Sequence, residues 1–233
     1  MGFVARRSVP VDPAVALCAA LVLAGLAFAG PLSGATPAAR GGAAGSRAAL
    51  PSTTADAPPP ARDARALRLA QPRALPPFTL TDQDGRPFHS REAFAGRVSL
   101  VFFGFVNCPD VCPTTLLRVR NLLAADPALA DVQVVMISVD GERDTPARLK
   151  RLLDAISPRF VGLTGDPARV RPVARSFSAS FVRQPPTGPD GAYVVDHSAQ
   201  LYLVDRDGRL STLFFNAPDE SLQDALRVAK SGR

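Results

Sequence analysis

Few residues in this sequence can bind metal ions or form disulfide bonds. Its 233 residues include three cysteines, two histidines and no tryptophan. A disulfide-stapled scaffold is excluded, because such scaffolds need several cysteine pairs. A structural zinc site takes four cysteine, histidine or carboxylate ligands, and this chain offers only two imidazoles. Hydrophobic residues make up 46% and charged residues 21% of the chain, which excludes a wholly disordered or fibrous protein.

The chain also lacks an excess of acidic residues, and its formal net charge is +6. This charge is unevenly distributed. Residues 1–75 contain eight arginines and three aspartates, a net charge of +5, whereas residues 76–233 contain 19 basic and 18 acidic residues, a net charge of +1. A domain that binds nucleic acid carries its basic residues on the folded surface. We therefore expect a nearly neutral folded domain and no nucleic-acid partner.

The N-terminal segment has the pattern of a membrane-targeting sequence. Arg6 and Arg7 precede residues 14–30, a run without charge. The run has 17 residues, slightly fewer than the ~20 that a helix needs to cross a bilayer. We interpret residues 1–30 as a signal peptide or transmembrane anchor and favour the anchor, which would hold the domain on the periplasmic side of the inner membrane. Cleavage at the A-x-A motif of residues 27–29 would instead give a secreted periplasmic form.

Residues 31–75 are rich in small residues and proline. Between residues 31 and 60, 25 of 30 positions are Ala, Gly, Pro, Ser or Thr. Such a segment has too few large side chains to form a core that offsets the entropy lost on ordering. We expect a disordered Ala/Pro-rich tether over residues 31–75, followed by one folded domain over residues 76–233.

Residues 76–233 contain the hydrophobic patterns of both strands and helices. Continuous apolar runs at 98–105 and 132–139 are typical of buried parallel strands. Helical spacing of apolar residues follows each run. Residues 78–88 read as an N-terminal hairpin, and residues 199–215 as an antiparallel hairpin with a final helix after it. The sequence therefore predicts an α/β sandwich with a central mixed sheet, plus the N-terminal hairpin.

Two of the cysteines, Cys108 and Cys112, fall between the first apolar strand and the helix after it. Open α/β sheets place ligands at such strand-to-helix junctions. Because Pro109 and Pro113 follow the cysteines, we expect both thiols at the mouth of the helix, where its dipole stabilises thiolates. The pair could chelate a soft metal ion such as Cu(I), or close a disulfide. The third cysteine, Cys18, is interpreted as an apolar residue of the N-terminal run.

The two histidines differ in their surroundings. His89 follows a hairpin strand next to Ser90 and is expected on the surface. His197 stands at the entry to a late strand, which this topology can bring beside the mouth of the first helix. Asp196 is adjacent and could fix the imidazole tautomer. His197 is therefore a candidate metal ligand.

The charged segment of residues 140–144 has two interpretations. Paired carboxylates could form an acid–base site, but the spacing favours a loop in which Asp144 or Thr145 caps a helix. We expect Glu142 and Arg143 to be solvated and Asp140 to act on the metal site indirectly. Met136 is assigned to the core. Phe105 is expected to pack near the metal site and shield it.

Three segments of the sequence resemble the Sco/SenC copper proteins. They are FGFVNCPDVCPTTL at 103–116, SVDGERDTP at 138–146 and DHSAQLYLVDRDGRL at 196–210. The resemblance covers about residues 76–231 and implies a thioredoxin-like fold in a membrane-tethered domain. It also implies a copper site, with Cu(I) or Cu(II) held by Cys108, Cys112 and His197. One departure is Gly141, where the family usually has proline, and a looser loop is expected there.

The resemblance implies a role as a copper metallochaperone for the binuclear copper site of cytochrome c oxidase subunit II, or for another copper-accepting protein. The alternative is an enzyme, a thiol-disulfide reductase that acts on the copper-ligand cysteines of that partner through Cys108 and Cys112. Thioredoxin-type reductases generally have CxxC and a cis-proline opposite it. This chain has three residues between its cysteines, and Ser198 rather than proline follows His197. The metallochaperone interpretation is therefore preferred.

Overall fold

The computed structural model of the protein describes residues 65–187 and 191–232. In this part of the chain an eight-stranded sheet has the order β1-β10-β9-β4-β5-β6-β2-β3. The strands are β1 (Ala66–Ala74), β2 (Thr79–Asp82), β3 (Pro87–His89), β4 (Ser99–Gly104), β5 (Gln133–Ser138), β6 (Val161–Thr164), β9 (Leu201–Val204) and β10 (Arg209–Phe214).

The sheet is mixed, as predicted. β4 pairs in parallel with β5, and β5 with β6, whereas β9 is antiparallel to β4 and to β10. All six residues of β4 are buried, which accounts for the continuous apolar run in the sequence. The predicted N-terminal hairpin is β2 and β3, which pair antiparallel.

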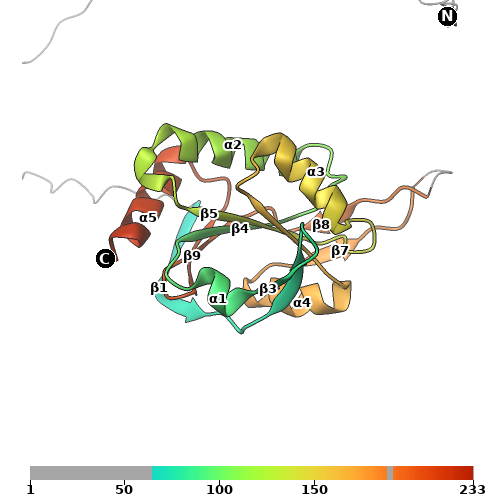
Figure 1. Ribbon diagram of the computed structural model, residues 1–233, viewed down its shortest axis with the longest axis horizontal. Coiled ribbons are helices and arrows are strands. Elements are labelled where there is room, and N and C mark those ends of the chain that lie inside the picture. The colour runs from blue at the N-terminus through green and yellow to red at the C-terminus, as the bar shows by residue number, and fades with distance from the viewer. Residues whose placement is uncertain (1–64, 188–190, 233) are drawn as a thin grey trace, which may run out of the picture. The chain divides into compact units, whose positions relative to one another are not determined.

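Helices cover both faces of the sheet. Figure 1 shows α2 and α3 on one face and α1 and α4 on the other. Thr145 caps α3, and Asp166 caps α4 by accepting a hydrogen bond from the Ala168 amide. The helices are α1 (Ser90–Phe94), α2 (Val111–Ala125), α3 (Pro146–Ile156), α4 (Pro167–Ser176) and α5 (Asp219–Ser231), with a short 3-10 helix at Pro127–Leu129.

The folded domain begins before the predicted boundary at residue 75. Ala66–Ala74 form the edge strand β1, which pairs antiparallel with β10 from Ala66 opposite Phe214 to Ala74 opposite Arg209. The predicted tether was therefore wrong for this segment. Little in the residue pattern indicates this strand, because an edge strand with most of its side chains exposed has no continuous apolar face.

A separate two-stranded sheet was also not predicted. β7 (Phe181–Arg183) and β8 (Val195–His197) pair antiparallel, with Phe181 opposite His197. Strands of three residues are too short to show a period of two in the sequence. This small sheet carries one of the predicted metal ligands and is labelled in Figure 1.

The predicted signal peptide or anchor of residues 1–30 and the tether up to residue 64 lie outside the described residues. Among the helices that the structure describes, none has the length and hydrophobicity needed to span a bilayer.

Candidate metal centre

The strand-to-helix junction after β4 places the two cysteines next to each other. The Cys108 amide donates a hydrogen bond to the Phe105 carbonyl at 3.2 Å, which closes a turn. The Cys112 amide in turn donates to the Cys108 sulfur at 3.4 Å. Amides in the first turn of a helix have no partner within the helix, so the Cys108 sulfur serves as a cap for α2.

Cys112 lies deeper than predicted. It is the second residue of α2 and is fully buried, whereas Cys108 is half-buried. Both thiols were expected at the mouth of the helix and not within a turn, but Cys112 lies inside the first turn of α2. Pro113 is tolerated there because its missing N–H removes no helical hydrogen bond. Burial raises the pKa of the Cys112 thiol, and the neighbouring Cys108 raises it further. The metal-free fold thus favours the protonated thiol at this position.

Gly104, the last residue of β4, makes room for the Cys112 sulfur. A β-carbon at Gly104 would lie 2.9 Å from that sulfur and 2.7 Å from the Phe102 ring. This role of Gly104 was not predicted from the sequence. The only signal available was a glycine inside an otherwise apolar strand, which often marks a close approach.

His197, the last residue of β8, lies next to Cys112. Its Nε2 atom lies 3.7 Å from the Cys112 sulfur, and its Nδ1 atom lies 3.0 Å from the Val195 carbonyl oxygen. A carbonyl can only accept a hydrogen bond, so Nδ1 carries the proton and the lone pair of Nε2 faces the thiol. This tautomer is the one that a metal bound beside Cys112 requires.

The tautomer is set by a different group from the one predicted. Asp196 points elsewhere and accepts a hydrogen bond from the side-chain amide of Gln184. The Val195 carbonyl, and not Asp196, fixes the imidazole tautomer. Phe105 contacts the imidazole edge-on, with ring centroids 5.5 Å apart, and Phe102 does so at 6.4 Å. These rings cover the histidine and keep its surroundings apolar.

The donor atoms suit a soft metal ion, although they are not yet arranged around a common centre. Among the described residues, no group of three or more Cys, His, Asp or Glu side chains forms a ready metal site. Cys112 and His197 already face each other, while the Cys108 sulfur is engaged with the Cys112 amide. Two sulfurs and one imidazole nitrogen match the preferences of copper in both common oxidation states. The donor set therefore fits copper, with Cys112 and His197 in contact and Cys108 adjacent.

The remaining sequence-predicted residues lie outside this group. His89 is exposed, and its Nδ1 atom lies 3.1 Å from the Thr79 hydroxyl. Met136 is fully buried in β5 and belongs to the core. Asp140 is buried too, but its partners are Arg143 and Tyr193, not the cysteines. Arg143 is therefore not a solvated residue, contrary to expectation.

Asp144 is the carboxylate that reaches the cysteine-bearing loop. It is fully buried and accepts hydrogen bonds from the Val106 amide at 2.9 Å and the Ser138 hydroxyl at 2.7 Å. Burial raises the pKa of its carboxyl group. Asp144 thus ties the loop before Cys108 to the end of β5, whereas Thr145 caps α3.

A sequence profile described as SCO1/SenC matches residues 68–229. The chain belongs to the SCO1/SenC family. A putative copper-binding protein of Stutzerimonas stutzeri is 40% identical over 163 residues, which are 69% of this chain and 78% of that relative.

Solved structures of Sco proteins share the fold. The structure of Bradyrhizobium japonicum ScoI with copper bound has 39% sequence identity and a TM-score of 0.59, and the match covers 66% of this chain and 98% of that one. BsSco, described as a member of the Sco family of cytochrome c oxidase assembly proteins with a disulfide switch, has 26% identity and a TM-score of 0.56. Its match covers 72% of this chain and all of that one, at 100%. The predicted thioredoxin-like fold is confirmed.

Gly141, at the position where Sco/SenC proteins usually have proline, does not stand in an open loop. A β-carbon on Gly141 would collide with the Gly165 carbonyl oxygen of the neighbouring loop. The loop is also closed by the amides of Arg143 and Asp144, which donate to the Asp140 carbonyl at 3.0 and 2.8 Å. Glycine here allows the two loops to approach each other closely.

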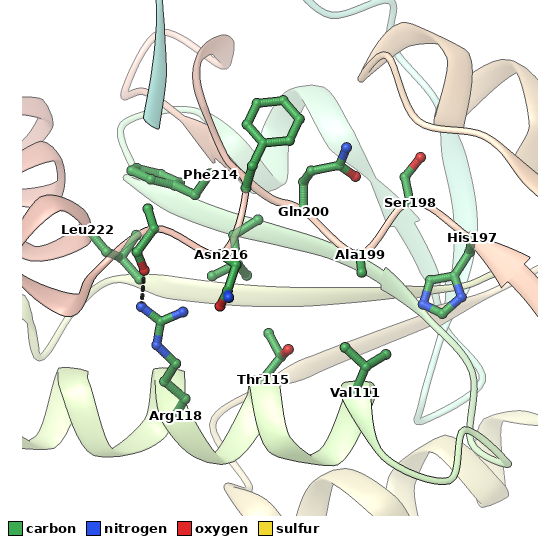
Figure 2. Close-up of a pocket in the computed structure, with 13 residues that line it drawn as sticks. Val111, Thr115, Arg118, His197, Ser198, Ala199, Gln200, Phe214, Asn216 and Leu222 are labelled. Carbon is green, nitrogen blue, oxygen red and sulfur yellow. Dashed lines mark hydrogen bonds between the residues drawn. The ribbon is translucent and has the colours of Figure 1, made fainter. Parts of the chain in front are cut away.

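A groove of about 570 Å³ extends from His197 along α2. Figure 2 shows Val111, Thr115 and Arg118 of α2 directed toward Asn216 and the segment that follows His197. Val111 and Phe215, both lining residues, are partly exposed apolar side chains. Arg118 is bound to Asp219 at 2.6 Å and to the Ala217 carbonyl, so the groove is largely uncharged. One ligand of the candidate centre therefore lies at the end of an accessible, mostly apolar surface.

Proposed function

We propose that this protein is a copper metallochaperone that delivers copper to the binuclear copper site of cytochrome c oxidase subunit II, or to another copper-accepting protein. The observation that carries the proposal is the 3.7 Å approach of His197 Nε2 to the Cys112 sulfur, with Cys108 adjacent. The copper bound in the related ScoI and the oxidase-assembly role given for BsSco agree with it.

In this proposal Cys108, Cys112 and His197 are the copper ligands. The two thiolates bind the soft Cu(I) ion, and the imidazole nitrogen is needed more by Cu(II), which prefers harder donors and more of them. Because thiols must lose their protons to bind, copper replaces the proton that burial retains on Cys112. The half-buried Cys108 is the ligand that a partner thiol can reach.

An anaerobic copper titration of the full chain tests the proposal. We expect one copper ion per chain, with the thiols of Cys108 and Cys112 lost from a thiol count on binding. Oxidation of Cys108 and Cys112 to a disulfide should abolish binding, because a disulfide offers no thiolate. Retention of copper affinity by the fully oxidised protein would show that the cysteines are not the ligands.

The second candidate function is a thiol-disulfide reductase that acts on the copper-ligand cysteines of the partner. It is favoured by the two free cysteines within contact distance of each other and by the disulfide switch described for BsSco. Thiol exchange depends on the cysteines and not on an imidazole ligand. Under this alternative, His197→Ala would leave oxidase assembly nearly intact, while either Cys→Ser change would abolish it.

We also propose that the domain is tethered to the inner membrane by residues 1–30 and works in the periplasm, with a cleaved, secreted form as the alternative. The charge pattern around the N-terminal apolar run supports this location. Fractionation of cells that express the full-length protein tests it. Recovery of the domain in the cytosol would contradict the location, and a soluble periplasmic form beginning near Gly30 would contradict only the anchor.

A further inference from the structure

The metal ligand His197 is carried by an element outside the main sheet. β8 pairs only with β7 in the described structure, and each strand has three residues. A two-stranded sheet of this size is at best marginally stable by itself. Contacts with the rest of the domain must therefore hold His197 opposite Cys112.

Phe181 and Val195 are buried in the core, and a further set of contacts lies at Tyr193, just before β8. Its hydroxyl donates a hydrogen bond to Asp140 Oδ1 at 2.7 Å, and its carbonyl accepts one from Arg143 Nη1 at 3.0 Å. Arg143 Nε also binds Asp140 Oδ2 at 2.5 Å. The loop between β5 and α3 thus holds both the side chain and the backbone of Tyr193.

Stacking adds to these hydrogen bonds. The guanidinium carbon of Arg143 lies 3.5 Å from the centre of the Tyr193 ring, and that of Arg183 in β7 lies 4.0 Å from it. Arg183 also forms an ion pair with Glu142 at 2.6 Å. Cations over an aromatic face are attracted by its quadrupole. Arg183 of β7 and Tyr193, just before β8, are therefore both in contact with the loop between β5 and α3.

We propose that Tyr193, together with Asp140 and Arg143, is a positioning residue that fixes the imidazole of His197 for copper binding. This proposal rests on the copper-binding function proposed above. Asp140, Arg143 and Tyr193 together are called the latch. The latch acts through the backbone, because Val195, two residues after Tyr193, provides the carbonyl that binds Nδ1 of His197.

Because Asp140 is buried, its carboxylate depends on its partners in the latch. Its side chain is 3% exposed, so its charge must be compensated, and Arg143 and the Tyr193 hydroxyl supply the compensation. Any movement of Tyr193 away from the loop would leave a buried carboxylate with one partner fewer. Burial and the hydrogen bond to Asp140 also raise the pKa of the Tyr193 hydroxyl, so it remains a donor at neutral pH.

The test compares Tyr193→Phe with Tyr202→Phe in the full chain. These are the two tyrosines of the protein, and each substitution removes one hydroxyl and keeps the ring. The Tyr202 hydroxyl donates to Gln200 at 3.2 Å and also interacts with the Ser198 side chain, but it does not touch the latch. Arg143→Lys is the second variant, since it keeps the charge but loses the planar group that stacks and binds two partners.

The first measurement is hydrogen exchange of the metal-free protein. Tyr193→Phe and Arg143→Lys should each increase exchange about tenfold at the amides of β7 and β8, the effect of losing one hydrogen bond. Exchange in β4 and β5 should stay unchanged, and Tyr202→Phe should affect the small sheet much less than the two latch variants do. Unchanged exchange of β7 and β8 in both latch variants would overturn the proposal, as would an equal effect of Tyr202→Phe.

The second measurement is the Cu(II) electron-spin spectrum of the loaded protein. Both latch variants should show a weakened or heterogeneous imidazole-nitrogen signature and a Cu(II) affinity lowered about tenfold. An imidazole signature and affinity equal to those of the wild type would overturn the positioning role. If the wild type itself bound no copper, the proposed function would fail, while the exchange result would still report whether the latch holds the small sheet.

Discussion

The imidazole Nε2 of His197 lies 3.7 Å from the sulfur of Cys112, although 85 residues separate them in the chain. The contact joins a helix of the central sandwich to a small sheet outside it. Because Nδ1 is engaged by the Val195 carbonyl, the nitrogen that faces the thiol carries a free lone pair.

Replacing His197 by alanine should lower the affinity for Cu(II) far more than the affinity for Cu(I). We expect Cu(II) affinity to fall about 100-fold or more and Cu(I) affinity to fall much less, because two thiolates alone can hold Cu(I). Competition titrations with Cu(I) and Cu(II) chelators measure this. His89→Ala is the matched control, since His89 is the other histidine and lies exposed on the N-terminal hairpin. Equal losses for both oxidation states would argue against a specific role of the imidazole with Cu(II).

Gly104→Ala should disturb the Cys112 thiol. The added methyl group would meet the Cys112 sulfur at 2.9 Å, and overpacking of this kind costs about 1–3 kcal/mol of stability. Gly162→Ala in β6 is the control, because its methyl group would meet Leu153 at 2.7 Å, away from the cysteines. Both variants should unfold at lower urea concentration, but only Gly104→Ala should also lower copper affinity. If both variants bound copper like the wild type, Gly104 would have no role at the site.

Asp144→Asn should change how stability depends on pH. Burial raises the pKa of Asp144 above its ordinary value of 3.8, so the folded protein binds this proton more tightly than the unfolded chain. The Asp144 contribution to the free energy of unfolding therefore decreases as pH rises from below that value through the folded pKa. Asparagine does not titrate but keeps an oxygen for the Val106 amide and the Ser138 hydroxyl.

Urea unfolding at several pH values from about 3 upward gives the difference between wild type and Asp144→Asn. The stability of the wild type relative to the variant should decrease as pH rises through this range. A difference that stays constant with pH, or one that increases, would contradict the assignment of a raised pKa to this carboxyl group.

Removal of β1 should destabilise the domain. A chain that begins at residue 76 lacks the edge strand β1, one of the two strands that pair with β10. We expect it to lose about 1–3 kcal/mol relative to a chain that begins at residue 65. Urea unfolding of the two chains and of the full-length protein measures the loss. Equal stability of the two shortened chains would show that β1 contributes little and that residue 75 is an adequate boundary.

The central strands and the candidate ligands could be predicted because each leaves a local pattern. β4 and β5 are continuous apolar runs, and Cys108 and Cys112 stand at a junction that the strand and helix patterns define. Their approach to His197 followed from topology, since a strand antiparallel to β4 begins where β4 ends.

The elements that were missed depend on tertiary contacts. β1 is an exposed edge strand, and β7 and β8 are stabilised by a loop distant in sequence. The role of Gly104 depends on the position of a sulfur eight residues later, and the tautomer of His197 on a backbone carbonyl in place of the adjacent carboxylate. None of these is visible in residue types and spacing alone.

The order of segments along the chain has a consequence for biosynthesis. Both thiols belong to the first strand–helix unit around β4 and α2, whereas the imidazole enters only with β8 and is followed by β9, the strand that completes the sheet beside β4. During synthesis from the N-terminus, the cysteine pair is complete long before its histidine has been made. Pairing of β9 with β4 is also a contact between distant parts of the sequence, which forms slowly. The newborn domain therefore passes through a stage in which its thiols lack the third ligand and are open to oxidation.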